Sequence, residues 1–518
     1  MLSRHHAHFP ALGLFLLITA GTAACTPKSE PEIGASLVVL LESGPMHLDP
    51  RIATDQASAR VFDLVYNGLV TKDTSGRFVP DLASSWEVLD GGRRYRFHLR
   101  PNVSFHDGSS LTAADVVWTF SSILDGNVIT PKRGSFPQFT TVEAVDELTI
   151  DFHLLEPYGA LVANLTSFLG IVPAGRSTEA MNRLPMGTGP FRFLHRTPDT
   201  LTLEAFDGYR DGRPKLDRVV LKEVPDATVR ALELRKGSAD LAVNALPPDM
   251  VMAFRRNEAF RVVEDPGSNY SYIGLNLEDP VLSSRDVRRA LASGLDRELL
   301  IRSLWRGLAV KTETLLPPGH WARHDELPSI TFDPDHSKHL LDGAGFPDPD
   351  GDGPDTRFSL VYKTSTDETA LLQAQIIQSM LAEIGVDIEI RSHEFATFYN
   401  DIKKGNFQLF SLTWTGIADP DVYSLILHSQ RIPPAGSNRG RYRNSEFDRL
   451  VDAGAREVDQ DSRRAQYLRA QEIVAEDLPY ISLFIKANVA VLPAGLAGYR
   501  NYPGGEFFSL KEVHWIDG

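Results

Sequence analysis

Apolar and polar side chains alternate strictly in two stretches of the first third of the chain. Between residues 94 and 100 the apolar positions are Tyr95, Phe97 and Leu99, and arginine or histidine fills the others. Residues 148–154 repeat the alternation. A period of two places successive side chains on opposite faces, so both stretches predict half-buried β-strands.

Helical spacing of apolar residues separates such stretches. Thr112 and Asp115 have the spacing of a capping box and open an amphipathic helix that extends to Leu124. A helical stripe over 377–384 precedes a further alternating stretch over 386–391. Helices and strands that take turns along the chain predict a mixed α/β protein.

Other local signals divide the rest of the chain. Ser283/Ser284 and Asp296 begin two more predicted helices, the second of which ends near Gly307. We interpret the turn-rich breaks as punctuation within lobes rather than as boundaries between independent domains. These breaks lie at Pro185–Pro190, Asp265–Asn269, Pro317–Gly319, Pro347–Pro354 and Pro433–Gly440.

The first residues predict export from the cytoplasm. A basic start leads into the apolar run Ala11–Ala20, which is shorter than the roughly 20 residues of a spanning helix. We predict a signal peptide over 1–24, a tether over 25–33 and a lipid anchor at Cys25, the only cysteine, whose setting resembles the lipobox of bacterial lipoproteins. Thr22 departs from that motif, so secretion without a lipid is the alternative.

Length and charge limit the classes of function. At 518 residues the chain exceeds the roughly 250 to 300 residues that one hydrophobic core supports, so several lobes are expected. The 53 Lys+Arg against 68 Asp+Glu residues include no cationic run suited to phosphates, which argues against nucleic acid as a partner. We expect a monomer that meets the membrane only through the lipid.

Ordered motifs run through nearly the whole chain after residue 40. They are Leu48–Pro50, Tyr66–Leu69, Pro80–Trp86, Phe97–Arg100, Phe105–Gly108, Ala114–Val117, Gly187–Phe191, Asp286–Ala290, Leu295–Arg297, Leu340–Leu341 before Gly345–Phe346, and Trp414 before Asp419–Asp421. In this order they resemble the bacterial extracellular solute-binding proteins of family 5. That family includes the dipeptide-, oligopeptide- and nickel-binding components of ABC importers.

The resemblance implies a mixed α/β fold of the periplasmic binding protein-like type II class. Two α/β lobes would be joined by a hinge of crossing strands, near Pro266–Tyr270 and Lys486–Asn488, and would carry an extra middle domain. Mapped onto this chain, the first lobe would comprise 34–70, 186–268 and 487–518, the middle domain 71–185, and the second lobe 269–486. The solute would lie between the lobes.

The chain carries no recognisable catalytic signature, so we do not expect an enzyme.

Asp348, Asp350 and Asp352 match the first half of a calcium loop, but Ser359 occupies the position of its bidentate glutamate. Calcium would therefore be at most a structural ion, and no cofactor is required. A solvated acidic turn is the alternative. The histidines that a nickel site would favour lack short ligand spacing. They are His47, His106, His393 and His428.

A buried solute needs aromatic walls and a few polar groups that fix its orientation. By the resemblance, residues of both kinds lie where the lobes meet. The candidates for solute binding are Asn269, Tyr270, Tyr272, Tyr362, Lys363, Phe395, Trp414, Thr415, Asp419 and Arg439. Core packing and capped turns are the alternatives for each of them.

Two departures from the peptide-binding pattern leave the cargo open. In peptide-binding members, an acidic residue three positions after the tryptophan pairs with the amino terminus of the peptide, and here that position is Ile417. The dipeptide-binding members also use an arginine to bind the ligand carboxylate. In the matching stretch of this chain only Lys363 could play a similar role. The resemblance therefore implies a binding component that delivers a small organic or peptide-like solute to an ABC permease, from the periplasm or the outer face of the cytoplasmic membrane. A sensing or chaperone-like role and a nickel or metal-chelate binder are the alternatives.

Overall fold

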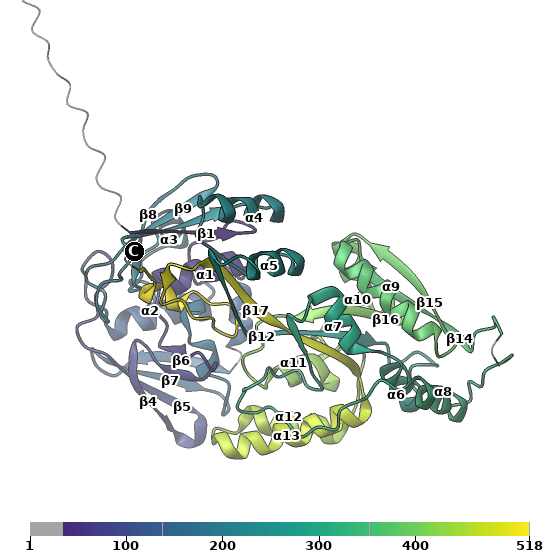
Figure 1. The fold of residues 1–518 in the computed structure, drawn as a ribbon. Coiled ribbons are helices and arrows are strands. Elements are labelled where there is room, and N and C mark those ends of the chain that lie inside the picture. Colours follow the sequence, from purple (N-terminus) through teal and green to yellow (C-terminus); the bar gives the residue numbers. More distant parts are fainter. Residues whose placement is uncertain (1–34, 137, 352, 517–518) are drawn as a thin grey trace, which may run out of the picture. The chain divides into compact units, whose positions relative to one another are not determined.

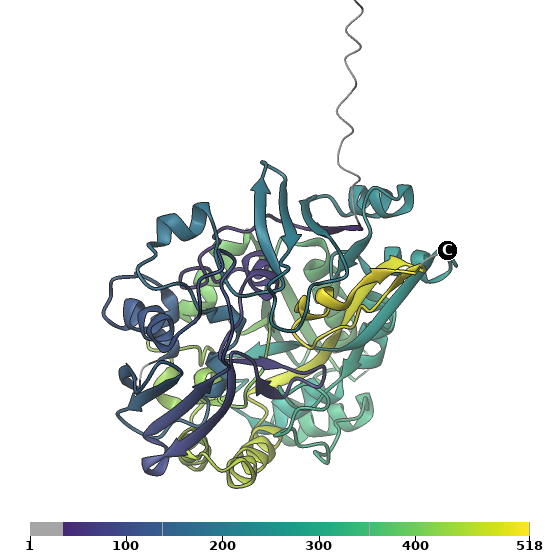
Figure 2. The same cartoon turned by 90° about the vertical axis from the view of Figure 1, so that its left-hand side faces the viewer.

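The longest strands of the fold, β12 (Phe260–Leu275) and β17 (Tyr480–Pro493), pair antiparallel over almost their whole length. The computed structural model describes residues 35–136, 138–351 and 353–516. β17, yellow in Figures 1 and 2, lies along teal β12. The two strands form the middle of an eleven-stranded sheet. Its other strands, in spatial order, are β15 (Val386–His393), β14 (Phe358–Ser365) and β16 (Leu409–Trp414) on one side, β11 (Leu241–Val243), β1 (Ser36–Leu41), β10 (Arg218–Glu223), β9 (Thr200–Ala205) and β8 (Phe191–Arg196) on the other, and β13 (Ala309–Lys311) beside β17.

The predicted break at Asp265–Asn269 is wrong, because the chain stays extended through it as part of β12. The register against β17 shifts between Pro266 and Asn269, which marks an irregularity of the ladder at the proline. Such a bulge accommodates a residue that cannot donate a backbone hydrogen bond. Both sites expected for the crossings, near Pro266 and near Lys486, lie within this paired ladder.

Helices cover both faces of the part of the sheet formed by β14, β15 and β16. On one face α9 (Glu368–Ala382) packs into a hydrophobic cluster with α6 (Arg285–Ser293) and α7 (Arg297–Trp305), and on the other face α10 (Phe395–Lys404) packs into a second cluster. Ser284 and Asp296 are the N-caps of α6 and α7, as predicted. The predicted strand after α9 is confirmed as β15.

The predicted strands 94–100 and 148–154 are confirmed in a separate four-stranded sheet. Its order is β4 (Ala83–Leu89), β5 (Arg94–Leu99), β7 (Thr149–Leu154) and β6 (Phe139–Ala144). The predicted helix is α2 (Ala113–Leu124), and Asp115 accepts a 2.9 Å hydrogen bond from the Thr112 backbone N–H, as a capping box requires. One hydrophobic cluster joins this sheet to β1, so the two share a core, and the boundaries at 71 and 185 stay predictions.

The remaining elements are helices of 6 to 18 residues and small strand pairs around these sheets. The helices are α1 (Gln56–Val65), α3 (Thr178–Arg183), α4 (Ala227–Lys236), α5 (Pro248–Arg255), α8 (Pro334–Gly343), α11 (Val422–Leu427), α12 (Ser445–Arg456) and α13 (Gln460–Asp477). The small strands are β2 (Val70–Lys72), β3 (Phe78–Pro80), β18 (Leu496–Ala497) and β19 (His514–Trp515).

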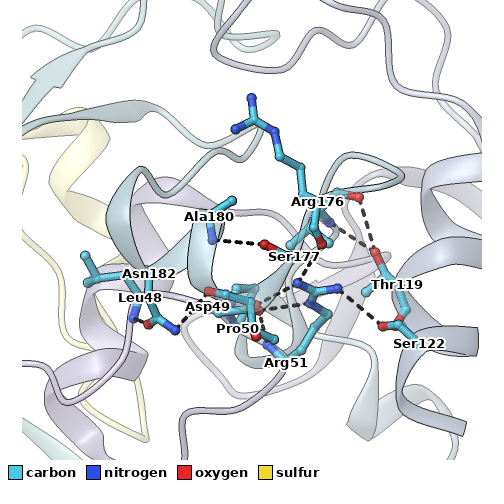
Figure 3. A network of polar contacts seen from close by, with 12 residues as sticks. Leu48, Asp49, Pro50, Arg51, Thr119, Ser122, Arg176, Ser177, Ala180 and Asn182 are labelled. Atoms are coloured by element: carbon cyan, nitrogen blue, oxygen red, sulfur yellow. Dashed lines mark hydrogen bonds and ion pairs between the residues drawn. The ribbon is translucent and has the colours of Figure 1, made fainter. Parts of the chain in front are cut away.

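A buried ion pair fixes the Leu48–Pro50 motif after β1 (Figure 3). The Arg51 guanidinium contacts the Asp49 carboxylate at 2.7 Å, and both side chains are at most 1 % exposed. Arg51 also donates to the Arg176 carbonyl at 3.0 Å, and the Leu48 N–H donates to the Asn182 side chain at 2.7 Å. These bonds tie the chain after β1 to the α3 region.

His106 ties the Phe105–Gly108 turn to the Gly187–Phe191 motif. Its Nδ1 accepts from the Gly187 N–H at 3.3 Å, so the ring proton lies on Nε2, which donates to the Gly189 carbonyl at 3.1 Å. Gly108 has a φ of +87° and its N–H donates to the Phe105 carbonyl at 2.9 Å, so the motif is a tight turn. Burial lowers the pKa of the His106 imidazole to about 4.

This histidine predicts a loss of stability in acid. Between about pH 6.5 and pH 4 the unfolded imidazole binds a proton that the folded one excludes, so the free energy of unfolding falls as the pH drops through that window. The shift corresponds to about 3 kcal/mol once both states are protonated. Melting temperatures of the wild type and His106→Gln between pH 4 and 7 test this, and the variant should show the shallower slope.

The matched control is His98→Gln, which changes a histidine whose side chain is 37 % exposed and contacts Glu87 on the sheet surface, and which should keep the wild-type slope. Equal slopes for the wild type and His106→Gln would contradict the assignment.

Candidate functional site

Three parallel strands end at one edge of the large sheet. β14 ends at Ser365, β15 at His393 and β16 at Trp414, and β14 pairs in parallel with both of the others. Ligands of open α/β sheets bind outside the carboxyl ends of parallel strands. This edge, beside the crossing strand β12, is therefore where the fold favours a binding site.

Aromatic rings and one guanidinium form a continuous stack at this edge. Phe395, 54 % exposed, stacks on Tyr399 with ring centroids 5.8 Å apart and planes 10° apart. The guanidinium carbon of Arg439 lies 5.1 Å from the Tyr399 ring and 4.6 Å from the Trp414 ring. Trp414 in turn lies parallel to Tyr272 at 6.5 Å. The stack thus leads from an exposed ring into the second lobe.

Arg439 is a buried cation without an anion. Its side chain donates to the hydroxyls of Tyr272 at 3.1 Å and Tyr399 at 2.9 Å, and the residue is only 6 % exposed. Within the described residues no carboxylate lies within 4 Å of its guanidinium. Burial raises the pKa of Tyr272 to about 12, so its hydroxyl stays a neutral partner. An uncompensated buried charge favours an anionic visitor.

The turn after Trp414 is fastened to β12. The Asn269 side chain accepts from the Gly416 N–H at 3.1 Å, and the Ile417 N–H donates to the Ser268 carbonyl at 3.2 Å. Thr415 is exposed, whereas Ile417 is 5 % exposed and packs in the cluster below α10. The position that is acidic in peptide-binding members is thus a core residue here.

A cavity of about 580 Å³ lies between residues 134–164 and residues 419–456. Asp419 lines it, but two hydrogen bonds of 2.9 and 2.6 Å bind its carboxylate to Arg463. Burial, together with neighbouring Asp419, raises the pKa of Asp421 to about 6. Asp419 is therefore engaged by an internal cation, which supports its alternative reading as a structural residue.

Three other candidates lie away from the exposed stack. Tyr270 and Tyr362 are both 0 % exposed, the first in the cluster below α10 and the second in the cluster below α9. The Lys363 ammonium contacts the Asp401 carboxylate at 2.5 Å. We withdraw the two tyrosines as direct contacts, because full burial removes them from any solute, and Lys363 already has a counter-ion.

The sequence reasoning missed Tyr399. Its signal was present, because Phe395 and Tyr399 are four residues apart and such residues lie on one face of a helix. What the spacing did not show is that Arg439, 40 residues later, would insert beside that face.

In the predicted calcium turn, the carboxylates accept hydrogen bonds from backbone N–H groups of the turn itself. Asp348 accepts from the Gly351 N–H at 3.0 Å, and Asp350 accepts from the Asp355 N–H at 3.0 Å. Asp352 lies outside the described residues. Calcium stays a prediction.

Potential metal ligands converge at one place in the described part of the chain. The group comprises Glu143, Asp151 and His153 on the four-stranded sheet. Asp151 already accepts from the Arg94 and Arg96 guanidiniums, which hold its pKa below the usual range. The four histidines weighed for nickel do not share this group, and His106 spends both ring nitrogens on the backbone.

The comparisons with known proteins agree with this geometry. The family model "Bacterial extracellular solute-binding proteins, family 5 Middle" matches residues 77–432. Heme-binding protein A of Haemophilus influenzae is 30 % identical over 94 % of each chain. The solved ABC transporter substrate-binding protein CtaP of Listeria monocytogenes has a TM-score of 0.84 at 26 % identity, over 94 % of this chain and all of its own.

The oligopeptide-binding protein AppA of Bacillus subtilis, solved with a nonapeptide, has a TM-score of 0.75 at 27 % identity, over 94 % of this chain and all of its own. The match confirms the two-lobed α/β fold that the motifs implied. Proteins of this family bind substrates and are not enzymes. The chain therefore belongs to the bacterial extracellular solute-binding proteins of family 5.

Proposed function

We propose that this chain captures a small peptide-like solute outside the cytoplasm and delivers it to the permease of an ABC importer. The observation that carries the proposal is the stack of Phe395, Tyr399, Arg439 and Trp414 at the carboxyl edge of the second lobe. Planar rings supply apolar contact area, and the unpaired guanidinium supplies orientation, which are the two needs of a solute pocket.

The contact set that we propose is smaller than the sequence suggested. It contains Phe395, Tyr399, Trp414, Thr415 and Arg439, with Asn269 shaping the turn. Tyr272 is buried behind these residues and positions Arg439 by accepting a hydrogen bond from its guanidinium. Closure about β12 and β17 would bring the first lobe onto this wall.

A peptide-like solute is supported by the relatives rather than by a matching terminus site. AppA was solved with a nonapeptide, and other relatives are dipeptide-binding proteins. Ile417 offers no carboxylate to a peptide ammonium, and burying an unpaired ammonium against it would be unfavourable by several kcal/mol. The solute is therefore held by groups other than an acid at this position.

Membrane attachment is proposed to rest on Cys25. This residue lies outside the described part of the chain, so the sequence alone supports the lipid. Among the described residues, no helix has the length and hydropathy needed to cross a membrane. Each buried acyl methylene contributes about 0.8 kcal/mol, so two or more chains suffice to hold the protein at a bilayer.

A sensing role on the same scaffold would use the same closure and the same wall. Import is the better supported reading, because the relatives include a binding protein of ABC transport and several peptide-binding proteins. Permease and ATPase genes next to the gene for this chain would favour import further.

Trp414→Ala should abolish the stabilisation that a solute confers. A ligand that binds only the folded state raises the melting temperature by mass action, and this substitution removes the ring that supports Arg439. The measurement is the melting-temperature shift caused by a tryptic digest of casein, relative to the same protein without peptide.

The matched control is Trp118→Ala, which removes a tryptophan that is 37 % exposed on α2 and should keep the wild-type shift. If Trp414→Ala keeps the full shift, Trp414 belongs to the core and not to the pocket.

Cys25→Ser should release the protein from the membrane. The wild type expressed in a bacterial host is expected in the membrane fraction, and the serine variant in the soluble extracytoplasmic fraction, because serine cannot accept the thioether-linked lipid. Thr22→Leu, which brings the sequence closer to the lipobox, serves as the control and should stay with the membrane. A wild type that is soluble and carries no lipid by mass spectrometry would establish plain secretion instead.

A further inference from the structure

Lys486 lies at the point where β17 passes from one lobe to the other. It pairs with Asn269 of β12 on one side and with Ala309 of β13 on the other. Its side chain points to the face of the sheet that carries Phe484, two residues earlier, since alternate residues of a strand share a face. Phe484 belongs to the cluster below α9, so Lys486 and Arg439 reach opposite faces of the sheet.

The ammonium of Lys486 rests on an indole ring. Its Nζ lies 4.0 Å from the Trp305 ring centroid, at the end of α7, and the same ring contacts Phe484 at 5.6 Å. In the described part of the chain no carboxylate comes within 4 Å of this Nζ. A cation–π contact of this kind attracts the ammonium but gives its N–H groups no oxygen acceptor, as a counter-ion would.

The surroundings of Lys486 include one unpaired donor. The Trp305 Nε1–H is buried and has no acceptor within the described residues. The carboxylate that attracts the Lys486 ammonium is that of Asp367, the N-cap of α9, which accepts from the Ala370 N–H at 2.9 Å and lies beyond ion-pair distance of Nζ. Burial lowers the pKa of Lys486 to about 8, an effect that Asp367 only partly offsets.

We propose that Lys486, supported by Trp305, is an anchor for a carboxylate of the bound solute. This inference rests on the proposed function and adds the class of solute: one that carries a free carboxylate which reaches the hinge. An ammonium that rests on an aromatic ring keeps its N–H donors free and attracts a carboxylate by charge and hydrogen bonding. A solute bound there would lie against β17, whose neighbours move when the lobes close, so charge neutralisation and closure would occur together.

Ile417 fits the same picture. The carboxyl edge of the second lobe presents cations on both faces, Arg439 and Lys486, while the position that would receive an ammonium is apolar. The site is therefore built to hold a solute by its negative groups.

The simpler alternative is that Lys486 only packs its stem along Trp305 and keeps its head in water. The two cases differ in what blocking the carboxylates of a solute does. We therefore compare a tryptic digest of casein with the same digest after methyl esterification. Peptides retained by the purified full chain are identified by mass spectrometry, for the wild type, Lys486→Met, Lys486→Arg and Lys404→Gln.

Lys486→Met keeps the length of the side chain without its charge, so folding should survive, and melting temperatures verify this. We expect the wild type to retain peptides from the free digest at least tenfold better than from the esterified one. Lys486→Met should lose this preference, Lys486→Arg should restore it, and Lys404→Gln, an exposed lysine of the same lobe, should keep it. A retained peptide is then compared with the same peptide synthesised as its C-terminal amide. Loss of binding by the amide would identify the terminal carboxylate, rather than an acidic side chain, as the group bound by Lys486.

Equal retention of free and esterified peptides by the wild type would overturn the role of Lys486 and leave the proposed function intact. The same holds if Lys486→Met keeps the wild-type preference. If the wild type retains no peptide from either digest, both the inference and the peptide-like function fail.

Discussion

The antiparallel pairing of β12 with β17 is the constraint on which the rest of the structure depends. These strands belong to both lobes, so a single hydrogen-bonded sheet continues from β8 through to β15. Backbone hydrogen bonds inside a sheet cannot be given up without leaving buried polar groups unpaired. Closure of the lobes, as we propose it, must preserve this pairing, and the irregularity between Pro266 and Asn269 is a point where the ladder is already interrupted.

The cations that stabilise the fold and the cations that we propose to bind the solute differ in their partners. Buried Arg51 and Arg463 each have a bidentate or close carboxylate partner, Asp49 and Asp419 respectively. Arg439 and Lys486 have aromatic rings instead. Lys132 and Arg288 also lack a carboxylate within 4 Å among the described residues, but both donate to backbone carbonyls. Burying a cation is unfavourable unless its charge or its donors are paired, and we therefore assign Arg439 and Lys486 to the proposed solute site.

The segment between β2 and α3 is a part of the first lobe's packing rather than an appendage. A common hydrophobic cluster joins its sheet to β1, the Asp49–Arg51 pair fixes the chain after β1 next to α3, and His106 binds two backbone groups of the Gly187–Phe191 motif. Its edge residues also line the cavity that Asp419 faces.

The sequence by itself determined the local elements and the family. Alternation gave β5 and β7, capping residues gave α2, α6 and α7, and the ordered motifs implied the two-lobed fold, because these depend on neighbours along the chain. Only the tertiary structure decided which candidates form a site. Tyr270 and Tyr362 read like pocket residues but are core, Asp419 is neutralised by Arg463, and Tyr399 meets an arginine 40 residues away. Lys486 carried no signal in its own segment, since the missing counter-ion of a cation becomes visible only when every neighbour in space is known.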